Sequence, residues 1–195
     1  MKDTTEGAYT ERLVRFQGAA WKRVLDVQAP YRWKLRRMLG DRVTLDVGCG
    51  IGRNLVNLPA GSVGVDHNDH SVEHCRSLGL TAFTPDEFHA SAAPQTFDGM
   101  LAAHLVEHLP RADAVTVLKS YLPYLRPGAR VVVITPQERG YASDATHVWF
   151  CGFEENADLC RELGLEVEDQ GSFPFPRAAG RRFTYNEFVT VARLP

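Results

Sequence analysis

The sequence predicts an α/β protein with a doubly wound, mostly parallel seven-stranded sheet that ends in an antiparallel C-terminal hairpin strand. From residue 42 onward, short β-rich runs alternate with helical stretches, which is typical of repeated β-α units. The run Arg130–Thr135 is almost entirely β-branched and apolar, as expected of a strand buried on both faces. The last two runs, Glu166–Gln170 and Tyr185–Ala192, have no helix between them and therefore favour an antiparallel pair.

The remaining elements follow in a regular order along the chain. Four further runs have the composition of short strands: Val43–Val47, Val63–Asp66, a weakly patterned run at 80–84, and Gly99–Ala103. Helices are expected after them, at about 52–58, 69–78 and 111–124. A last helix over Glu154–Leu163 ends at Gly164, because glycine is a common C-terminal cap.

The segment before the first strand, residues 1–39, reads as a helical extension, and residues 40–195 read as one domain. Apolar side chains recur every three or four positions from residue 8 to 39, and Pro30 is expected to divide the segment into two helices. Its aromatic residues suit either a lid over a pocket or a helix packed on a sheet edge.

Composition restricts the classes of partner. The 195 residues include 44% hydrophobic and 24% charged residues, with a net charge of −2, so no nucleic acid or anionic membrane is expected as a partner. Four cysteines without a CxxC pair favour reduced thiols. A polar N-terminus and the lack of an apolar run of about 18 residues favour a cytoplasmic protein. We expect a monomer or homodimer that acts on a small molecule.

A glycine-rich turn is the strongest local signal. The apolar strand that ends at Val47 runs directly into Gly48, Gly50 and Gly52, which permit positive φ angles and let a ligand lie against bare backbone. In an open α/β sheet, ligands bind at the carboxyl ends of the strands near such a turn. Asp66, at the tip of the second strand, is placed to accept hydrogen bonds from both hydroxyls of a ribose.

Two nucleoside cofactors could use this layout. A dinucleotide such as NAD needs G-x-G-x-x-G spacing, so that its pyrophosphate reaches the helix N-terminus. Here the spacing is G-x-G-x-G, and Arg53 follows the last glycine. Asp46 precedes the turn and would repel a pyrophosphate, whereas it suits the ammonium and sulfonium groups of S-adenosylmethionine. The pattern therefore favours S-adenosylmethionine over NAD.

At this point the sequence resembles a known family. Leu45–Gly52 is similar to the D/E-x-G-x-G-x-G motif of class I (Rossmann-like) S-adenosylmethionine-dependent methyltransferases, and Asp66 resembles the ribose-binding acid of that family. Phe97-Asp98 continues the resemblance, as does Leu105–Leu109, which is similar to the "LEHL" after the fourth strand. Leu125–Ala129 is similar to the "LKPGG" before the fifth strand, and the resemblance extends over residues 40–195.

The resemblance implies a role for each matching cofactor-binding residue. Gly48, Cys49 and Gly50 would bind the cofactor with the two glycines against its methionine part, and Asp46 would face its ammonium group. The remaining assignments are Asp66 to the ribose, His67 beside the adenine, a loop of Asp86, Glu87 and Phe88 at the adenine edge, and His104 on the methionine side.

The histidines also allow metal-site hypotheses, which the sequence disfavours. His104, Glu107 and His108 match H-x-x-E-H, a zinc signature that requires both histidines on one helical face. Because His104 directly follows a strand, the two rings need not share a face, and no metal is expected. His67, His70 and His74, with Cys75, have ligand-like spacing but suit an exposed helix face.

A loop beyond the fifth strand carries the candidate catalytic residues. Asp144 or His147 could accept a proton from a substrate hydroxyl, because the ionisation of a histidine side chain lies near neutral pH. Methyltransferases similar to this chain carry a D-x-x-H-V segment here. Alternatively, His147 caps the following helix or packs on Trp149.

The predicted function is methyl transfer from S-adenosylmethionine to an oxygen or nitrogen atom of a small acceptor, with S-adenosylhomocysteine as the product. The cofactor carries an activated methyl group, so the protein mainly positions the reactants and removes a proton where needed. Two alternatives remain: a non-catalytic S-adenosylmethionine-binding protein of the same fold, and an NAD-dependent oxidoreductase. A third alternative, a zinc hydrolase, would be revealed by stoichiometric metal in the purified protein.

Overall fold

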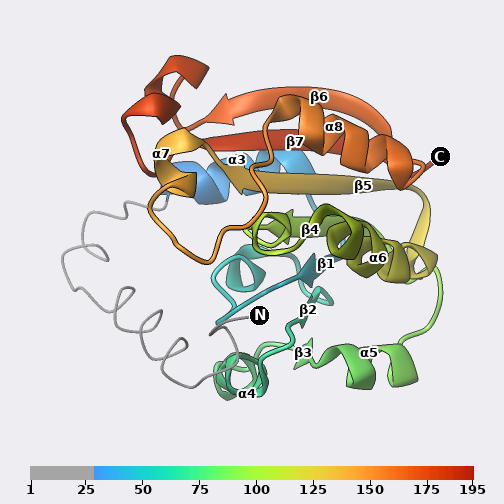
Figure 1. Cartoon of the computed structure of the whole chain (residues 1–195). Coiled ribbons are helices and arrows are strands. Elements are labelled where there is room, and N and C mark those ends of the chain that lie inside the picture. The colour runs from blue at the N-terminus through green and yellow to red at the C-terminus, as the bar shows by residue number, and fades with distance from the viewer. Residues whose placement is uncertain (1–28) are drawn as a thin grey trace. The chain divides into compact units, whose positions relative to one another are not determined.

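The computed structural model describes residues 29–195, and its strands form one mixed seven-stranded sheet in the order β3-β2-β1-β4-β5-β7-β6 (Figure 1). The strands are β1 (Thr44–Val47), β2 (Val63–Val65), β3 (Ala82–Phe83), β4 (Phe97–Ala103), β5 (Leu125–Pro136), β6 (Glu166–Phe173) and β7 (Glu187–Arg193). Strand β2 runs parallel to β1 and β3, β4 runs parallel to β5, and β7 runs antiparallel to both β5 and β6. The predicted fold class is therefore confirmed.

Helices and short 3-10 turns connect the strands. The helices are α3 (Ala29–Leu39), α4 (Asp69–Ser77), α5 (Pro85–Ser91), α6 (Arg111–Tyr121), α7 (Glu138–Tyr141) and α8 (Phe153–Glu162). The 3-10 turns are η1 (Leu55–Asn57), η2 (Val106–His108), η3 (Leu122–Tyr124) and η4 (Arg177–Arg181). The chain divides into two compact units, one ending at Ser91 and the other beginning at Ala92.

The first unit is built on strand β1, whose four residues are all buried. Strand β2 pairs with it in parallel, with Asp46 opposite Gly64. Helix α4 begins where predicted, because the Asn68 side chain accepts hydrogen bonds from the backbone N–H groups of His70 and Ser71. Val72 and Cys75 on α4 pack with Cys49 and Ala82, a cluster that fixes the glycine turn to the rest of this unit.

The prediction of a helix at 52–58 is wrong, because only the 3-10 turn η1 forms there. Gly52 has a φ of +79°, a left-handed conformation that does not continue a right-handed helix. Pro59 acts from the other end, because proline forces the residue before it out of the helical region. Leu58 accordingly adopts an extended conformation with φ −86° and ψ 158°.

The second unit has its core along β4, β5 and β7. Met100, Leu101 and the run Val131–Ile134 are buried, as predicted for a strand covered on both faces. Helix α8 packs against β6 and β7 (Figure 1). It ends as predicted, since Gly164 takes a left-handed φ of +75° and its N–H donates to the carbonyl of Arg161.

Helix α3 is the described part of the N-terminal segment. It begins at Ala29, so Pro30 lies in its first turn, where the missing N–H of proline is tolerated. Leu35, Met38 and Leu39 are buried. The part of the predicted helical segment that precedes residue 29 lies outside the described residues, so the lid and the division into two helices stay predictions. Across residues 29–195, no helix is both long and apolar enough to cross a membrane.

Candidate functional site

The glycine turn after β1 is clamped onto the end of β2. The backbone N–H groups of Gly48 and Cys49 both donate to the carbonyl of Val65, at 2.8 and 3.1 Å. Gly48 and Gly50 have φ angles of +76° and +52°, the left-handed region that disfavours residues with a side chain. The turn therefore depends on glycine at these positions, as predicted.

Gly50 and Gly52 serve different purposes in this turn. A Cβ atom built on Gly52 would come within 2.7 Å of Leu80 Cδ1, so this glycine permits close packing inside the unit. A Cβ atom on Gly50 would meet no protein atom within 4 Å. Gly50 therefore leaves bare backbone beside open space, the arrangement that a ligand needs in order to lie against the turn.

Asp66 connects the end of β2 to the glycine turn and to α4. Its Oδ2 accepts a hydrogen bond from the backbone N–H of Gly50 at 2.8 Å, and its Oδ1 accepts one from Asn68 at 2.9 Å. Each carboxylate oxygen has a second lone pair, so both can still accept a hydroxyl donor. His67 is adjacent, with Nδ1 3.6 Å from Asp66 Oδ1 and a side chain that is 45% exposed.

Asp46 is completely buried beside this turn. Neither of its carboxylate oxygens has a hydrogen-bond partner among residues 29–195. Burial raises the pKa of Asp46 to about 7, and the negative charge of Asp66 acts in the same direction. The backbone N–H of Leu55 favours the charged form without reaching hydrogen-bond geometry. A cationic ligand at the turn would compensate this unpartnered carboxylate.

The loop expected at residues 86–88 is instead the first turn of α5. Thr84 and Glu87 form a reciprocal capping pair, in which Thr84 N–H donates to Glu87 Oε2 at 2.8 Å and Glu87 N–H donates to Thr84 Oγ1 at 3.4 Å. Pro85 occupies the first helical position, which proline favours. Phe88 is buried and Glu87 also pairs with Arg76, while Asp86 is exposed, so the adenine role of these residues stays a prediction.

In the second unit, His104 follows β4 with a φ of +56°, an uncommon conformation for a residue with a side chain. Its Nδ1 lies 3.1 Å from Glu107 Oε1 and its Nε2 lies 2.8 Å from Glu187 Oε1. Partial desolvation opposes a charge on the ring, but the two carboxylates outweigh it and raise the pKa of His104 to about 10. The side chain is 41% exposed, and its role toward the cofactor stays a prediction.

The structure places Asp144 and His147 in one loop but in different environments. Thr146 donates from its backbone N–H and its hydroxyl to Asp144 Oδ1, at 3.0 and 2.7 Å. Partial burial acts the other way, but these bonds hold the pKa of Asp144 below its usual value. His147 Nδ1 lies 2.7 Å from the backbone carbonyl of Tyr141, and the two rings stack.

Sequence reasoning missed His108 and Thr146 as parts of this loop's environment. His108 Nδ1 lies 3.0 Å from Thr146 Oγ1, and the His108 and His147 ring centroids are 4.7 Å apart. Burial is the main cause that lowers the pKa of His108. The adjacent residues Thr146 and His147 give no local signal of a partner 38 positions before Thr146, so only the fold reveals the pair.

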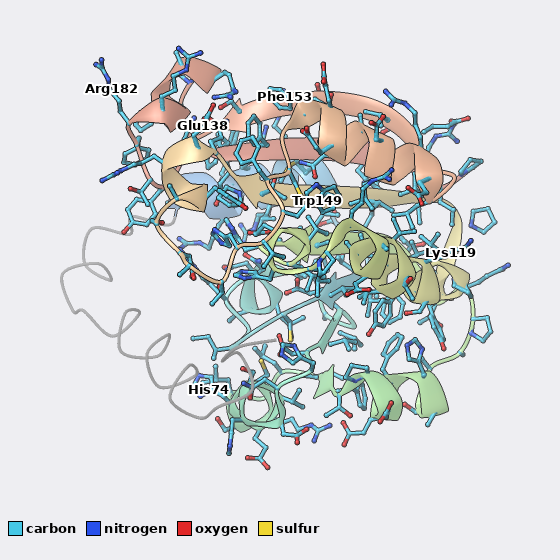
Figure 2. The ribbon with its side chains drawn as sticks, in the orientation of Figure 1. His74, Lys119, Glu138, Trp149, Phe153 and Arg182 are labelled. Carbon is cyan, nitrogen blue, oxygen red and sulfur yellow. The ribbon has the colours of Figure 1, made fainter. Side chains whose placement is uncertain are left out.

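The two histidine patterns singled out in the sequence are not brought together as metal sites. His104 has both ring nitrogens engaged by carboxylates, so H-x-x-E-H does not converge as a unit. Among residues 29–195, His67, His70, His74 and Cys75 form no group with converging ligand atoms. The exposed helix face expected of these residues is found only in part: His67 and His70 are exposed, His74 on α4 is half-buried, and Cys75 is buried (Figure 2).

Comparisons with known proteins find methyltransferases. A family model described as a methyltransferase domain matches residues 16–170. A ubiquinone biosynthesis O-methyltransferase from Aeromonas salmonicida is 30% identical over 109 residues, which are 50% of this chain and 44% of that protein. The human probable tRNA methyltransferase 9B is 26% identical over 162 residues, which are 80% of this chain and 33% of that protein.

A solved structure has the same fold over nearly its whole length. The S-adenosylmethionine-dependent methyltransferase from Archaeoglobus fulgidus superimposes with a TM-score of 0.68 at 21% identity, covering 95% of this chain and 99% of that chain. The chain spans less than half the length of the two curated relatives described above.

Ionisation of Asp46 should destabilise the ligand-free protein. Its pKa is raised from 3.8 to about 7 on folding, so stability falls as the pH rises through this interval, and the full penalty applies above pH 7. An Asp46→Asn variant cannot ionise. The free energy of unfolding of the variant minus that of wild type should therefore increase from pH 4 to pH 8, by up to about 4 kcal/mol.

Urea unfolding of both proteins at pH 4, 6 and 8, without any cofactor, measures this difference. Parallel stability profiles of the variant and the wild type over this range would show that Asp46 does not change its protonation state on folding.

Proposed function

The chain belongs to the methyltransferase domain family, and on this premise we propose that it transfers a methyl group from S-adenosylmethionine to an oxygen or nitrogen atom of a small-molecule acceptor. The observation that carries this proposal is the unpartnered carboxylate of Asp46, buried beside bare backbone at Gly50. A cofactor with a positive charge compensates such a carboxylate, whereas a pyrophosphate would be repelled by it.

The residues of the first unit fit the parts of this cofactor. The backbone of Gly48, Cys49 and Gly50 would hold the methionine part, while Asp46 acts on its ammonium group through the electrostatic field. Asp66 has a free lone pair on each oxygen and would accept both ribose hydroxyls. His67 would lie beside the adenine. When bound, the cofactor supplies a methyl group that is already activated on a sulfonium sulfur.

His147 is the side chain of the second unit best suited to accept a proton. The carbonyl of Tyr141 can only accept a hydrogen bond, so Nδ1 of His147 carries the proton and Nε2 holds a lone pair. A lone pair on Nε2 can take the proton of an acceptor hydroxyl or amine. Asp144 is occupied by Thr146, and we assign it to positioning the loop rather than to proton transfer.

A small acceptor is favoured over a nucleic acid. The net charge of −2 provides no electrostatic attraction for a polyanion. The names of the curated relatives include both kinds of activity, ubiquinone biosynthesis O-methylation and tRNA methylation. Incubation of the protein with methyl-labelled cofactor and either a metabolite extract or total tRNA, followed by mass spectrometry, tests the choice. Label in tRNA alone would contradict the proposal.

Removal of the Asp66 carboxylate should weaken cofactor binding. Asp66→Ala eliminates hydrogen bonds from a charged group to the ribose, so the affinity for S-adenosylhomocysteine should fall by about 1.5–3 kcal/mol. Calorimetry measures the affinity, and a thermal melt of the variant checks that the turn and α4 still fold. Unchanged affinity in a folded variant would remove Asp66 from the ribose site.

A side chain at position 50 should block the cofactor. Gly50→Val directs a branched side chain into the open space beside the turn and should abolish binding of S-adenosylhomocysteine. Gly79→Val is the matched control, because Gly79 also has a left-handed φ, +76°, and open space around its Cβ position. The control should share the backbone strain and keep full affinity. Equal loss in both variants would attribute the effect to strain.

Replacement of His147 should slow turnover without weakening cofactor binding. His147→Ala removes the proton-accepting lone pair, and loss of a general base lowers kcat by about 10²–10⁴-fold. Steady-state kinetics with the acceptor that the labelling experiment identifies gives kcat, and calorimetry gives the affinity for S-adenosylhomocysteine. A normal kcat would assign the ring to packing against Tyr141.

A further inference from the structure

The geometry points to a divalent metal site formed by Glu107, His108 and His147, which would take a first-row transition metal ion of the Zn²⁺ or Mn²⁺ class. One ligand atom from each of these residues lies within 4.8 Å of the other two. Two imidazoles and one carboxylate are the ligand set of three-residue sites that keep open coordination positions. Among residues 29–195, no other group of three such side chains converges in this way.

Hydrogen bonds prepare both imidazoles to act as ligands. The carbonyl of Tyr141 fixes the proton of His147 on Nδ1, which leaves Nε2 with a lone pair. The hydroxyl of Thr146 donates its single proton to Asp144 and must therefore accept from Nδ1 of His108. Nε2 of His108 is left with a lone pair as well. Metal-binding histidines are typically oriented by such bonds from their other ring nitrogen.

Glu107 supplies an independent reason to expect a cation. Its side chain is completely buried, and Oε1 accepts a hydrogen bond from His104. Oε2 has no hydrogen-bond partner among residues 29–195. A buried carboxylate oxygen without a partner is unfavourable unless a donor or a metal ion compensates it. A divalent ion held between Glu107 and the two imidazoles would provide that compensation.

The backbone already holds the two halves of the site together. The carbonyl of Glu107 accepts hydrogen bonds from the N–H groups of Val148 and Trp149, at 2.8 and 3.2 Å. Figure 2 labels Trp149 in the loop between α7 and α8, which also carries His147. Metal–ligand bonds of about 2.0–2.2 Å place ligand atoms about 3–3.5 Å apart. Side-chain rotations that move each ligand atom by about 1 Å would therefore bring the three atoms to metal-binding distance.

This site differs from the H-x-x-E-H pattern that the sequence suggests. His104 is not a ligand, because Glu107 and Glu187 occupy its two ring nitrogens. His147 takes its place from a distant loop. The inference rests on the proposed function only for its consequence. A metal ion held by these residues would favour ionisation of an acceptor hydroxyl, whose proton would pass to water. His147 would then be a metal ligand and would not take the proton itself.

Cobalt titration of the metal-free, tag-free protein tests the site. We expect one Co²⁺ per chain, with visible d–d absorption, and displacement of the absorption by Zn²⁺. His147→Ala should weaken Co²⁺ binding at least tenfold. Thr146→Val keeps the side-chain shape but removes the hydroxyl that orients His108, and should weaken binding by about 10–100-fold. His74→Ala, on α4, is the control and should bind like wild type (Figure 2).

The readouts separate failure of the site from failure of the proposed function. Thermal melts establish that each variant is folded, and calorimetry with S-adenosylhomocysteine is run on the same metal-free samples. No stoichiometric Co²⁺ binding by wild type, or equal binding by His147→Ala, overturns the metal site, whether or not the nucleoside binds. Co²⁺ binding without nucleoside binding leaves the metal site standing and removes the proposed function.

Discussion

The hydrogen bonds of the Asp66 carboxylate are the constraint on which the first unit depends. One side chain fixes the Gly50 N–H with one oxygen and the Asn68 N–H with the other. Asn68 in turn caps α4, so the glycine turn, the end of β2 and the start of that helix share a single anchor. Because this anchor is itself a proposed ligand contact, cofactor binding and the local stability of the turn are expected to be coupled.

Glu107 has a comparable position in the second unit. Its backbone carbonyl holds the loop that carries His147, and its side chain reaches His104. Asp144 and His147, the two residues that the sequence predicts for proton transfer, thus belong to a loop that is held by the 3-10 turn η2 after β4. Carboxylates organise both units, but they differ in how they are satisfied. Asp66 accepts hydrogen bonds from backbone donors, whereas Asp46 in the first unit and one oxygen of Glu107 in the second have no hydrogen-bond partner within residues 29–195.

Strong local patterns were sufficient to predict much of the fold. The β-branched run Val131–Ile134 and the glycine cap at Gly164 encode their structures in adjacent residues, and both predictions are confirmed. The helix at 52–58 was wrong because two local breakers, Gly52 and Pro59, outweigh its apolar content. The T-x-x-E order of Thr84 and Glu87 is a local signal for the start of a helix, but helix α5 is not among the helices predicted from the sequence.

Contacts between distant segments had no comparable signal. Glu187 meets His104 across 83 positions, and His108 meets Thr146 across 38, so neither pairing is visible in a local pattern. The cofactor residues Gly48, Gly50 and Asp66 were located in the sequence because one turn and the tip of the next strand contain them all. The surroundings of His147 could not be located in this way, because they come from η2, α7 and the loop itself.

The left-handed backbone of His104 has a consequence for how this chain can vary. A glycine at position 104 would adopt the φ of +56° without steric strain, but it would also remove the ring that lies between Glu107 and Glu187. Positions 104 and 187 are therefore tied to each other. Exchange of the histidine alone leaves two acidic groups facing one another, and exchange of the glutamate alone removes half of the support for an uncommon backbone conformation. Viable descendants of this sequence are expected to alter both positions together or neither.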